Sequence, residues 1–517
     1  MPKCTVNGKQ IEVKPGTSII EAFKEAGENI AHYCWHPGLS VAGVCRLCMV
    51  EIEGNPRLQI ACNTMVQEGM VVSNQSDKVK DAVRWGLDFH LINHPLDCPI
   101  CDQAGECGLQ EQYMEFGKYE PEMAERKVKK RKVVDLGPKV VLDSERCILC
   151  SRCVRFTDEV TKTRELGIFN RGDRSEIGTF KDRPLDNNYS LNTVDICPVG
   201  ALTSRDFRFR QRVWYLKNKE TICTGCSTGC NVKAYYNEDG LFRVKPVHNE
   251  DINGYWMCDE GRDIYKFANP EFRLKTARKG TQDHWDDINV VEAAKSVGSI
   301  VKTSVDTDGA GSVAVVLTGQ HSNEEYDAIL EWINGDLKVD QVYHWVNNPE
   351  KFDDFDGLLL RGDRNPNTKG LLERLDARKL NKTWQDFETK LKAGTVKVVI
   401  VVGPENPAVY SDMGEKVQLI NGVDKVVWMS ACPVGELNTM TGTTWQIPLK
   451  TFVEKPGTYV NFQGRAQTVK PVTFLVKQAL SVVEAVQLMA GEASKVELVE
   501  PEHHPKKNYF VYSRGPL

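Results

Sequence analysis

Cysteine is the residue type whose number and spacing point to chemistry in this chain. Of its 17 cysteines, all but Cys432 lie between Cys4 and Cys258. Most of them fall into four groups whose short spacings let several thiolates reach one metal centre. A reducing compartment disfavours structural disulfides and leaves thiolates available to bind metal. We therefore expect an N-terminal half rich in metal and a C-terminal half without it.

The first group contains Cys34, Cys45, Cys48 and Cys62. Only two residues separate Cys45 from Cys48, so their thiolates are expected to share an iron, with Cys34 and Cys62 joining from flanking loops. Four thiolates can hold a [2Fe–2S] centre, and Gly43 would let backbone amides approach its sulfides. A four-cysteine zinc site is the alternative. The long gap before Cys45 and the strand–turn–strand–helix pattern ahead of it favour the cluster.

The second group combines one histidine with three cysteines: His94, Cys98, Cys101 and Cys107. Three thiolates and one imidazole can ligate a [4Fe–4S] cluster, and the neutral imidazole changes the charge of the cluster and hence its potential. His94 lies four residues before a cysteine pair, where an expected helix ends. Most single histidines are structural, and we expect that role for His32, His36 and His90.

The third group is Cys147, Cys150 and Cys153 with the distant pair Cys197-Pro198. Bacterial ferredoxins use three cysteines at this spacing followed by Cys-Pro, and two-cluster versions exchange the fourth ligand. One triplet and one Cys-Pro predict a single [4Fe–4S] cluster. Three cysteines at this tight spacing suit zinc poorly.

The fourth group is Cys223, Cys226 and Cys230, with Cys258 further along the chain. These four thiolates predict another [4Fe–4S] cluster, although zinc is a serious alternative for this spacing alone. Two cysteines stay outside the groups. Cys4 is expected to be a small core residue of the first strand, and Cys432 has no partner cysteines.

Local patterns place the groups on recognisable elements. Residues 4–6 and 11–13 flank Asn7-Gly8 and predict a hairpin, and Ser18 with Glu21 forms a capping box for a helix over 20–26. A strand over 49–52 and an amphipathic helix over 77–93, stopped by Pro95, would follow. The basic run 126–132 is expected to be a solvated linker, with a docking patch for an acidic partner as the alternative.

Beyond about residue 280 the pattern becomes that of an α/β domain. Residues 313–317 and 396–402 are apolar runs rich in β-branched residues, each followed by a glycine turn, with helical patterns between them. Buried parallel strands have this composition. A further helix is predicted over 475–490, and the polar tail 501–517 is expected to be extended.

Composition and charge exclude other classes of protein. The formal net charge is −5 and the pI about 6.1, so bulk charge gives no support to a nucleic-acid partner. No apolar run approaches the ~18 residues that a membrane span needs. The first residues lack the apolar segment of a secretory signal, which predicts a chain that stays in the cytoplasm or an equivalent compartment.

Three of the cysteine groups lie in stretches that resemble one family. These stretches are residues 32–48 (HYCWHPGLSVAGVCRLC), 98–110 (CPICDQAGECGLQ), and 146–148 with 195–203 (RCI and DICPVGALT). They are similar to the large iron–sulfur subunit of respiratory complex I, which is the G subunit of NADH-quinone oxidoreductase in bacteria and the 75 kDa subunit in mitochondria. Ala104 and Gly108 stand where members often have Gly and Asp. The fourth group and residues 454–467 (EKPGTYVNFQGRAQ) resemble molybdopterin oxidoreductases.

The resemblance implies an α+β and α/β multidomain fold with five parts. They are a β-grasp [2Fe–2S] ferredoxin-like domain (1–77), a helical one-histidine/three-cysteine [4Fe–4S] domain (78–118), a ferredoxin-like [4Fe–4S] domain (119–215), a molybdopterin-oxidoreductase-type [4Fe–4S] domain (216–272), and a truncated molybdopterin-oxidoreductase-like α/β domain (273–517). No cysteine lies between Cys258 and Cys432 to ligate molybdenum, so the last part is expected to be a scaffold without cofactor.

The same resemblance implies the electron-transfer subunit of a proton-translocating NADH-quinone oxidoreductase. It would carry one [2Fe–2S] and three [4Fe–4S] clusters and neither molybdenum nor flavin, with the fourth cluster off the electron path. Its partners would be the flavin-bearing NADH-dehydrogenase subunit, a [2Fe–2S] subunit and the quinone-side subunits, at the cytoplasmic face of the inner membrane. The alternatives are the electron-input subunit of a soluble NAD-linked hydrogenase or formate dehydrogenase, and a zinc-bound assembly scaffold.

Overall fold

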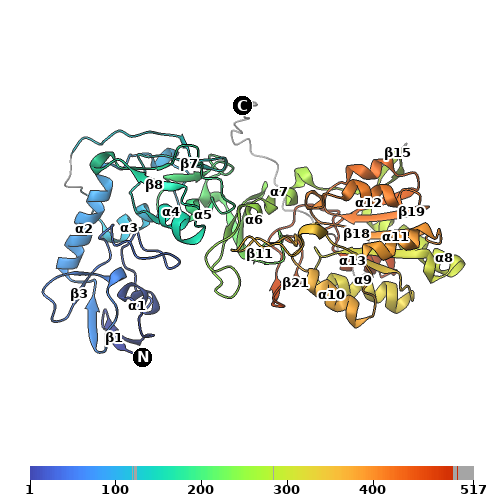
Figure 1. Cartoon of the computed structure of the whole chain (residues 1–517), viewed down its shortest axis with the longest axis horizontal. Helices are drawn as coiled ribbons and strands as arrows, with labels where there is room; N and C mark the ends of the chain where they lie inside the picture. The colour runs from blue at the N-terminus through green and yellow to red at the C-terminus, as the bar shows by residue number, and fades with distance from the viewer. Residues whose placement is uncertain (119, 121–124, 283, 493–495, 497, 499–517) are drawn as a thin grey trace. The chain divides into compact units, whose positions relative to one another are not determined.

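The computed structural model describes residues 1–118, 120, 125–282, 284–492, 496 and 498 (Figure 1). The chain divides into two compact units, with the boundary between Tyr215 and Leu216, and each unit is described by itself. In the described part of the chain, no helix is both long and apolar enough to cross a bilayer.

The first unit begins with a five-stranded mixed sheet in the order β2-β1-β5-β3-β4. Asn7 and Gly8 both have positive φ, as the tight turn of the first hairpin requires. The expected capping box of Ser18 and Glu21 opens α1, which packs Ile19, Ile20 and Phe23 against the sheet with Cys4. The elements are β1 Lys3–Val6, β2 Lys9–Glu12, α1 Ile19–Glu25, β3 Met49–Ile52, β4 Gln59–Ile60 and β5 Met70–Ser73. This is the predicted β-grasp arrangement.

The rest of the first unit is built from short elements around a common core. The amphipathic helix α2 buries Val79, Val83 and Leu87, close to the predicted pattern. Two small antiparallel sheets, β10-β7-β6 and β8-β9, follow. The bounds are α2 Asp77–Leu91, α3 Gly108–Phe116, β6 Val134–Asp135, β7 Val140–Leu142, α4 Arg152–Arg155, β8 Leu166–Phe169, β9 Glu176–Thr179, α5 Asn192–Asp195 and β10 Leu202–Ser204.

The second unit starts with a three-stranded antiparallel sheet, β11-β12-β13, followed by two short helices. Strands β11 and β12 form a hairpin in which Ile222 pairs with Asn231. The bounds are β11 Lys217–Ile222, β12 Asn231–Asn237, β13 Gly240–Pro246, α6 Asp259–Arg262 and α7 Ile264–Ala268.

A seven-stranded sheet in the order β15-β14-β20-β19-β18-β16-β17 forms the body of the second unit. The five strands from β20 to β17 are parallel, and β14 pairs antiparallel with β20. Residues of α8, α9, α10 and α13 share one core with one face of the sheet, and residues of α11 and α12 share another with the opposite face. This three-layer α/β domain, drawn in yellow to red in Figure 1, confirms the predicted fold class.

The elements of this domain run from β14 to α13. They are β14 Ala277–Thr281, β15 His284–Ile288, α8 Val290–Asp308, β16 Val313–Thr318, α9 Asn323–Leu330, β17 Val342–Trp345, α10 Thr368–Ala377, α11 Trp384–Lys392, β18 Val398–Val402, α12 Met413–Ile420, β19 Lys425–Ser430, β20 Thr443–Pro448, β21 Gly457–Val460, β22 Ala466–Val469 and α13 Val482–Met489.

Two local predictions need correction. The helix predicted over 475–490 begins only at Val482, because Leu480 donates its backbone N–H to Pro448 and Ser481 caps the helix. The basic run 126–132 is irregular, as expected of a linker, but it is not simply solvated. Lys127 donates to the carbonyls of Leu91 and Ile92, and further charges of the run form ion pairs within the unit. The tail 501–517 lies outside the described residues.

Candidate metal centres

The four cysteines of the first group are all buried, with at most 6% of any residue exposed. Cys48 directly precedes β3, and Cys62 lies in a 3-10 turn, Ala61–Asn63, that follows β4. The pairing of Met49 with Ile60 between these strands brings the two loops together. The backbone N–H of Tyr33 points at the sulfur of Cys45 from 3.5 Å.

Hydrogen bonds divide these four thiols into two pairs, Cys34 with Cys45 and Cys48 with Cys62. The bond from Cys45 lowers the pKa of Cys34 to about 5, and the bond from Cys48 lowers the pKa of Cys62. A [2Fe–2S] centre held by four cysteines has room for two thiolates on each iron. The β3–β4 pairing places Cys62 close to Cys48, and the sharing of one iron by Cys45 and Cys48 stays a prediction.

The second group surrounds the end of α2 and the start of α3. Cys98 lies in a 3-10 turn, Cys98–Ile100, and is exposed, whereas Cys101 and Cys107 are buried. Burial, followed by the charge of Arg146, lowers the pKa of His94 to about 4, so its imidazole is neutral at neutral pH. Its Nδ1 is buried and has no hydrogen-bond partner among the described residues. A neutral imidazole with a free ring nitrogen is what an iron ligand requires.

Charged side chains cluster beside the second group. Asp97, which directly precedes Cys98, accepts from Lys132 at 2.5 Å and from Arg146 at 2.9 Å. Arg146 also pairs with Asp143 at 3.3 Å, and both of these side chains are 5% exposed. These contacts tie the basic run to the cysteine loop.

The third group encloses a small cavity of about 20 Å³, which all four of its cysteines line. Leu149 and Ser151 adopt the left-handed conformation, with φ of 54° and 62°, and so fold the loop tightly. The N–H of Leu149 approaches the sulfur of Cys147 at 3.4 Å, and backbone amides also bond to Cys197. Amides directed at sulfur suit a thiolate-bound cluster, whose potential they tune.

The three groups of the first unit meet in one packed core. Cysteines of all three belong to a single cluster of hydrophobic contacts. A Cβ built on Gly200, three residues after Cys197, would lie 2.2 Å from the sulfur of Cys101. A Cβ on Gly108, next to Cys107, would lie 3.2 Å from the carbonyl oxygen of Pro198. The loop of the third group therefore packs directly on the second, and only glycine fits at that contact.

The fourth group lies on the β11–β12 hairpin and at the start of α6. Cys223 directly follows β11, Cys230 directly precedes β12, and Cys258 caps α6. The N–H groups of Gly225 and Gly261 point at the sulfurs of Cys223 and Cys258 at 3.4 and 3.3 Å. All four cysteines are at most 5% exposed and line a cavity of about 120 Å³.

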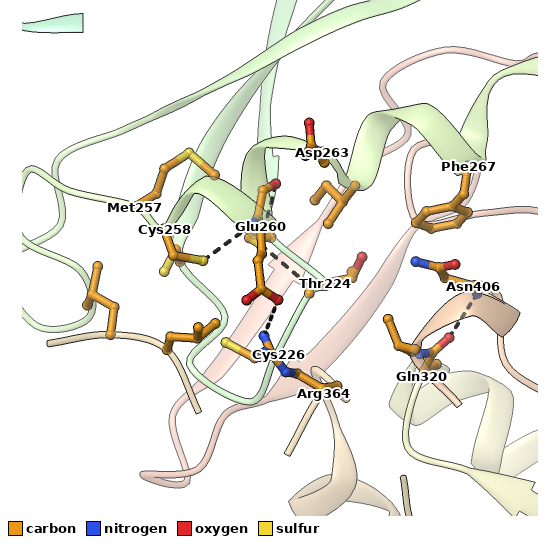
Figure 2. A pocket seen from close by; sticks show the side chains of 18 of the residues that line it. Thr224, Cys226, Met257, Cys258, Glu260, Asp263, Phe267, Gln320, Arg364 and Asn406 are labelled. Atoms are coloured by element: carbon orange, nitrogen blue, oxygen red, sulfur yellow. Dashed lines mark hydrogen bonds and ion pairs between the residues drawn. The ribbon is translucent and has the colours of Figure 1, made fainter. Parts of the chain in front are cut away.

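The cavity of the fourth group opens against the α/β domain at the point where the strand order of the large sheet reverses. Strands β16 and β18 are neighbours there, and the loops leaving their carboxyl ends bring Gln320, Glu405 and Asn406 to the cavity wall. Open α/β sheets bind their ligands at such switch points. Figure 2 shows Arg364 paired with Glu260 beside the cysteines, with their charged atoms 2.8 Å apart.

Loops of the α/β domain hold the hairpin that carries the fourth group. Ser227 donates its N–H to the carbonyl of Asp363 at 3.0 Å and accepts from the N–H of Phe462 at 2.9 Å. Thr228 donates to Leu359, and Gln467 donates to Gly229 at 2.8 Å. The second half of the chain thus supplies part of the fourth site, although no sequence pattern indicated it.

The spacing of the sulfurs separates iron clusters from single zinc ions. Tetrahedral zinc with Zn–S bonds of about 2.3 Å holds neighbouring sulfurs about 3.8 Å apart. In the described residues, the only three histidine, cysteine or acidic ligand atoms that all lie within 4.8 Å of one another belong to His321, Glu325 and Glu405. No three sulfurs of a cysteine group meet this spacing anywhere in the described residues.

Several residues that shape these sites were not predicted. Arg152 and Arg155 connect the first and third groups, Arg146 lies beside the second, and Arg364 with Glu260 lies beside the fourth. The only sequence signal is local, because Arg152 stands between two cysteines of the third group. Arg364 is distant in sequence from every cysteine of its site, so its place follows from the tertiary fold alone.

Comparison with known proteins identifies each of these regions. Residues 3–77 match the 2Fe-2S iron-sulfur cluster binding domain, and residues 86–122 match the NADH-ubiquinone oxidoreductase-G iron-sulfur binding region. Residues 137–203 match the ferredoxin-like domain of NADH-quinone oxidoreductase subunit 3. Residues 216–270 match the molybdopterin oxidoreductase Fe4S4 domain. Domains that bind [2Fe–2S] and [4Fe–4S] clusters are thus present.

Individual relatives agree with these matches. The chain is 40% identical over 267 residues to the G subunit of NADH-quinone oxidoreductase of Rickettsia bellii, a match that covers 51% of this chain and 39% of that protein. It is 41% identical over 262 residues to the mitochondrial 78 kDa subunit of NADH-ubiquinone oxidoreductase of Candida albicans, covering 50% and 36%. A chain of an NAD⁺-reducing [NiFe]-hydrogenase structure is 31% identical, with a TM-score of 0.37, over 41% of this chain and 91% of that one.

The matched segments span less than half the length of the two curated relatives. Within that span, four successive domains correspond in type and order to the four cysteine groups. The iron–sulfur region of this chain is therefore similar to the corresponding region of NADH-quinone oxidoreductase G subunits.

Proposed function

We propose that this chain is the electron-transfer iron–sulfur subunit of a proton-translocating NADH-quinone oxidoreductase. It holds one [2Fe–2S] cluster in the first cysteine group and a [4Fe–4S] cluster in each of the second, third and fourth groups. It contains neither molybdenum nor flavin. The domain boundaries expected from the sequence belong to the same proposal.

The observation that carries this proposal is the shared core of the first three groups. Electron transfer between clusters needs short distances and exclusion of water, and cysteines of all three groups contribute to one packed core. The Gly200 contact leaves no room for even a methyl group between the second and third groups. In such a protein the clusters supply the redox chemistry, and the chain supplies spacing, burial and electrostatics.

The need for an NADH-binding partner is inferred from the missing nucleotide-binding motif. No Gly-x-Gly-x-x-Gly motif stands between a strand and a helix, so NADH binds to a flavin-bearing partner subunit rather than here. Electrons then leave toward a [2Fe–2S] subunit and the quinone-side subunits, at the cytoplasmic face of the inner membrane. The fourth cluster lies off this path and stabilises the β11–β12 hairpin. No nucleic acid takes part.

Cysteine variants of the full chain test the cluster assignment. We expect Cys150→Ala to remove one [4Fe–4S] signal from the electron paramagnetic resonance (EPR) spectrum of anaerobically purified, dithionite-reduced protein. Cys432→Ala is the matched control, because Cys432 is also a buried cysteine but belongs to no group, and its spectrum should equal that of the wild type. Stoichiometric zinc and no acid-labile sulfide in the wild-type chain would overturn the assignment.

Affinity purification of the tagged chain from mildly solubilised membranes tests the partners. Recovery of a flavin NADH-dehydrogenase subunit together with proton-channel membrane subunits supports the proposal. Recovery of a nickel–iron hydrogenase or a molybdenum subunit in their place would contradict the assigned reaction and leave the cluster assignments standing.

A further inference from the structure

Two arginines join the loop of the first cysteine group to the loop of the third. They are Arg152 and Arg155, the first and last residues of α4. Arg152 donates from Nη1 to the carbonyl of Ile196 at 3.0 Å and from Nη2 to the carbonyl of Trp35 at 2.5 Å. Trp35 follows Cys34, and Ile196 precedes Cys197. One guanidinium therefore holds a neighbour of a ligand cysteine at each of two sites.

Arg155 repeats this arrangement on the ligand cysteines themselves. Its Nη2 lies 2.5 Å from the carbonyl oxygen of Cys34 and 3.5 Å from that of Cys150. A single nitrogen atom thus contacts the backbone of cysteines from both groups. Nη1 of Arg155 donates to the carbonyl of Ser40 in the loop of the first group. Glu159 accepts from the N–H of Ser40 at 2.8 Å and holds the same loop without adding positive charge.

Arg152 also carries a donor that the protein does not satisfy. Its Nε is buried and has no acceptor among the described residues. The guanidinium of arginine stays charged in proteins, and leaving a buried donor unpaired is unfavourable. Arg152 lies within electrostatic range of Cys34, Cys150 and Cys197. A sulfur of a bound cluster, which carries negative charge, is the acceptor that this environment offers.

We propose that Arg152 and Arg155 form a bridge that sets both the separation and the reduction potentials of the first and third clusters. This inference rests on the proposed function. An electron passing between the two sites would form or break no bond, and both guanidinium groups would stay protonated. The two positive charges would favour the reduced, more negative state at both sites, and the Nε–H of Arg152 would be available to a sulfur of a bound cluster.

EPR-monitored redox titration of the full chain, purified anaerobically with its clusters, tests the bridge. In Arg155→Met and Arg152→Met we expect the midpoint potentials of the first and third centres to fall, while those of the second and fourth stay in place. A tenfold change in the reduction equilibrium would appear as a shift of about 59 mV for a one-electron couple. Arg164→Met is the matched control, because Arg164 is 75% exposed and pairs with Asp158 rather than with a cysteine loop.

Arg155→Lys and Glu159→Gln separate charge from geometry. Arg155→Lys keeps the charge but cannot reach both carbonyls, so the potentials should move little while the spin–spin interaction between the two reduced centres weakens. Glu159→Gln keeps both arginines and removes a negative charge bonded to the same loop, so the potential of the first centre should rise, opposite to its shift in the arginine variants. Wild-type potentials in iron-replete Arg155→Met and Arg152→Met, or an unaltered spin–spin interaction in Arg155→Lys, would overturn the bridge. A wild-type chain without cluster signals would overturn the proposed function instead.

Discussion

Lys455 is a buried cation held between two buried carboxylates, and its loss is expected to destabilise the α/β domain strongly. Its Nζ lies 2.7 Å from Glu325 and 2.5 Å from Glu405, and the three side chains are 1–2% exposed. Glu325 also accepts from the N–H groups of Ser322 and Val482. In Lys455→Met the two carboxylates would remain in the core without their cation.

Two magnitudes agree on the size of the effect. Removing one partner of a buried ion pair destabilises a protein by about 3–5 kcal/mol. Burial by itself would raise the pKa of Glu325, but the charge and hydrogen bond of Lys455, together with His321 and the N–H of Ser322, lower it from 4.5 to about 2. That difference corresponds to about 3 kcal/mol in favour of the folded state at neutral pH. Typical domains are stable by about 5–15 kcal/mol, so the substitution removes a large share.

The effect has a definite dependence on pH. Because the folded pKa of Glu325 is below its ordinary value of 4.5, the stabilisation is complete above about pH 5 and is lost as the pH falls toward 2. Burial already raises the pKa of Glu405 in the wild type. In Lys455→Met burial would raise the pKa of Glu325 as well, so acid protonates both carboxyl groups and removes their repulsion. The difference in stability between variant and wild type is therefore largest at neutral pH and shrinks in acid.

Hydrogen–deuterium exchange of the full chain measures this difference in the α/β domain. We expect the amides of β16 and β18 to exchange on the order of a hundredfold faster in Lys455→Met at neutral pH. Lys397→Met is the matched control, because the Lys397–Asp424 pair is far more exposed, at 49% and 62%, and exposed pairs contribute about 1 kcal/mol or less. Equal exchange rates in the two variants would refute the reasoning.

The remaining predictions concern the metal centres. Gly200→Ala would place a methyl group 2.2 Å from the nearest sulfur of the second group and should abolish the EPR signal of that centre. Gly414→Ala is the control, because a Cβ there meets nothing within 4 Å, and it should leave that EPR signal intact. His94→Cys should keep the second cluster but lower its potential, since an anionic thiolate replaces a neutral imidazole; an unchanged potential would show that His94 is not a ligand. Arg364→Gln should lower the potential of the fourth centre and Glu260→Gln should raise it, because the two changes remove opposite charges beside the cysteines; shifts of the same sign in redox titrations would contradict this.

The sequence predicted which cysteines lie together better than the contacts within each group. Short cysteine spacings indicate proximity directly, which is why Cys147, Cys150 and Cys153 line one cavity as expected. The closeness of Cys62 to Cys48 was not predictable from spacing, because it depends on the pairing of β3 with β4, the next strand along the chain. The fold class of both units was predictable, since turn signals, capping boxes and buried β-branched runs are local.

The ion pairs of residues 454–467 could not be predicted from local sequence patterns. The sequence indicates a glycine turn and a family resemblance there, but the structure adds two consecutive buried ion pairs. Glu454 pairs with Arg273 at 2.6 Å, with both side chains at most 1% exposed, and Lys455 pairs with two glutamates. Buried charges of this kind need partners from distant segments, so neither pair can be inferred from one stretch of sequence.

The arginines near the cysteine groups were harder to predict from the sequence than the candidate ligands. A ligand must stand at a fixed spacing from its neighbours, so the sequence reveals it. A residue that sets a potential needs only charge and proximity, so it can come from any segment: Arg152 from within a cysteine loop, and Arg364 from the α/β domain. The second case implies that the fourth site depends on the whole second unit. Its hairpin is held through Ser227 by loops at Asp363 and Phe462. Substitutions in the α/β domain should therefore affect the fourth cluster more than the clusters of the first unit.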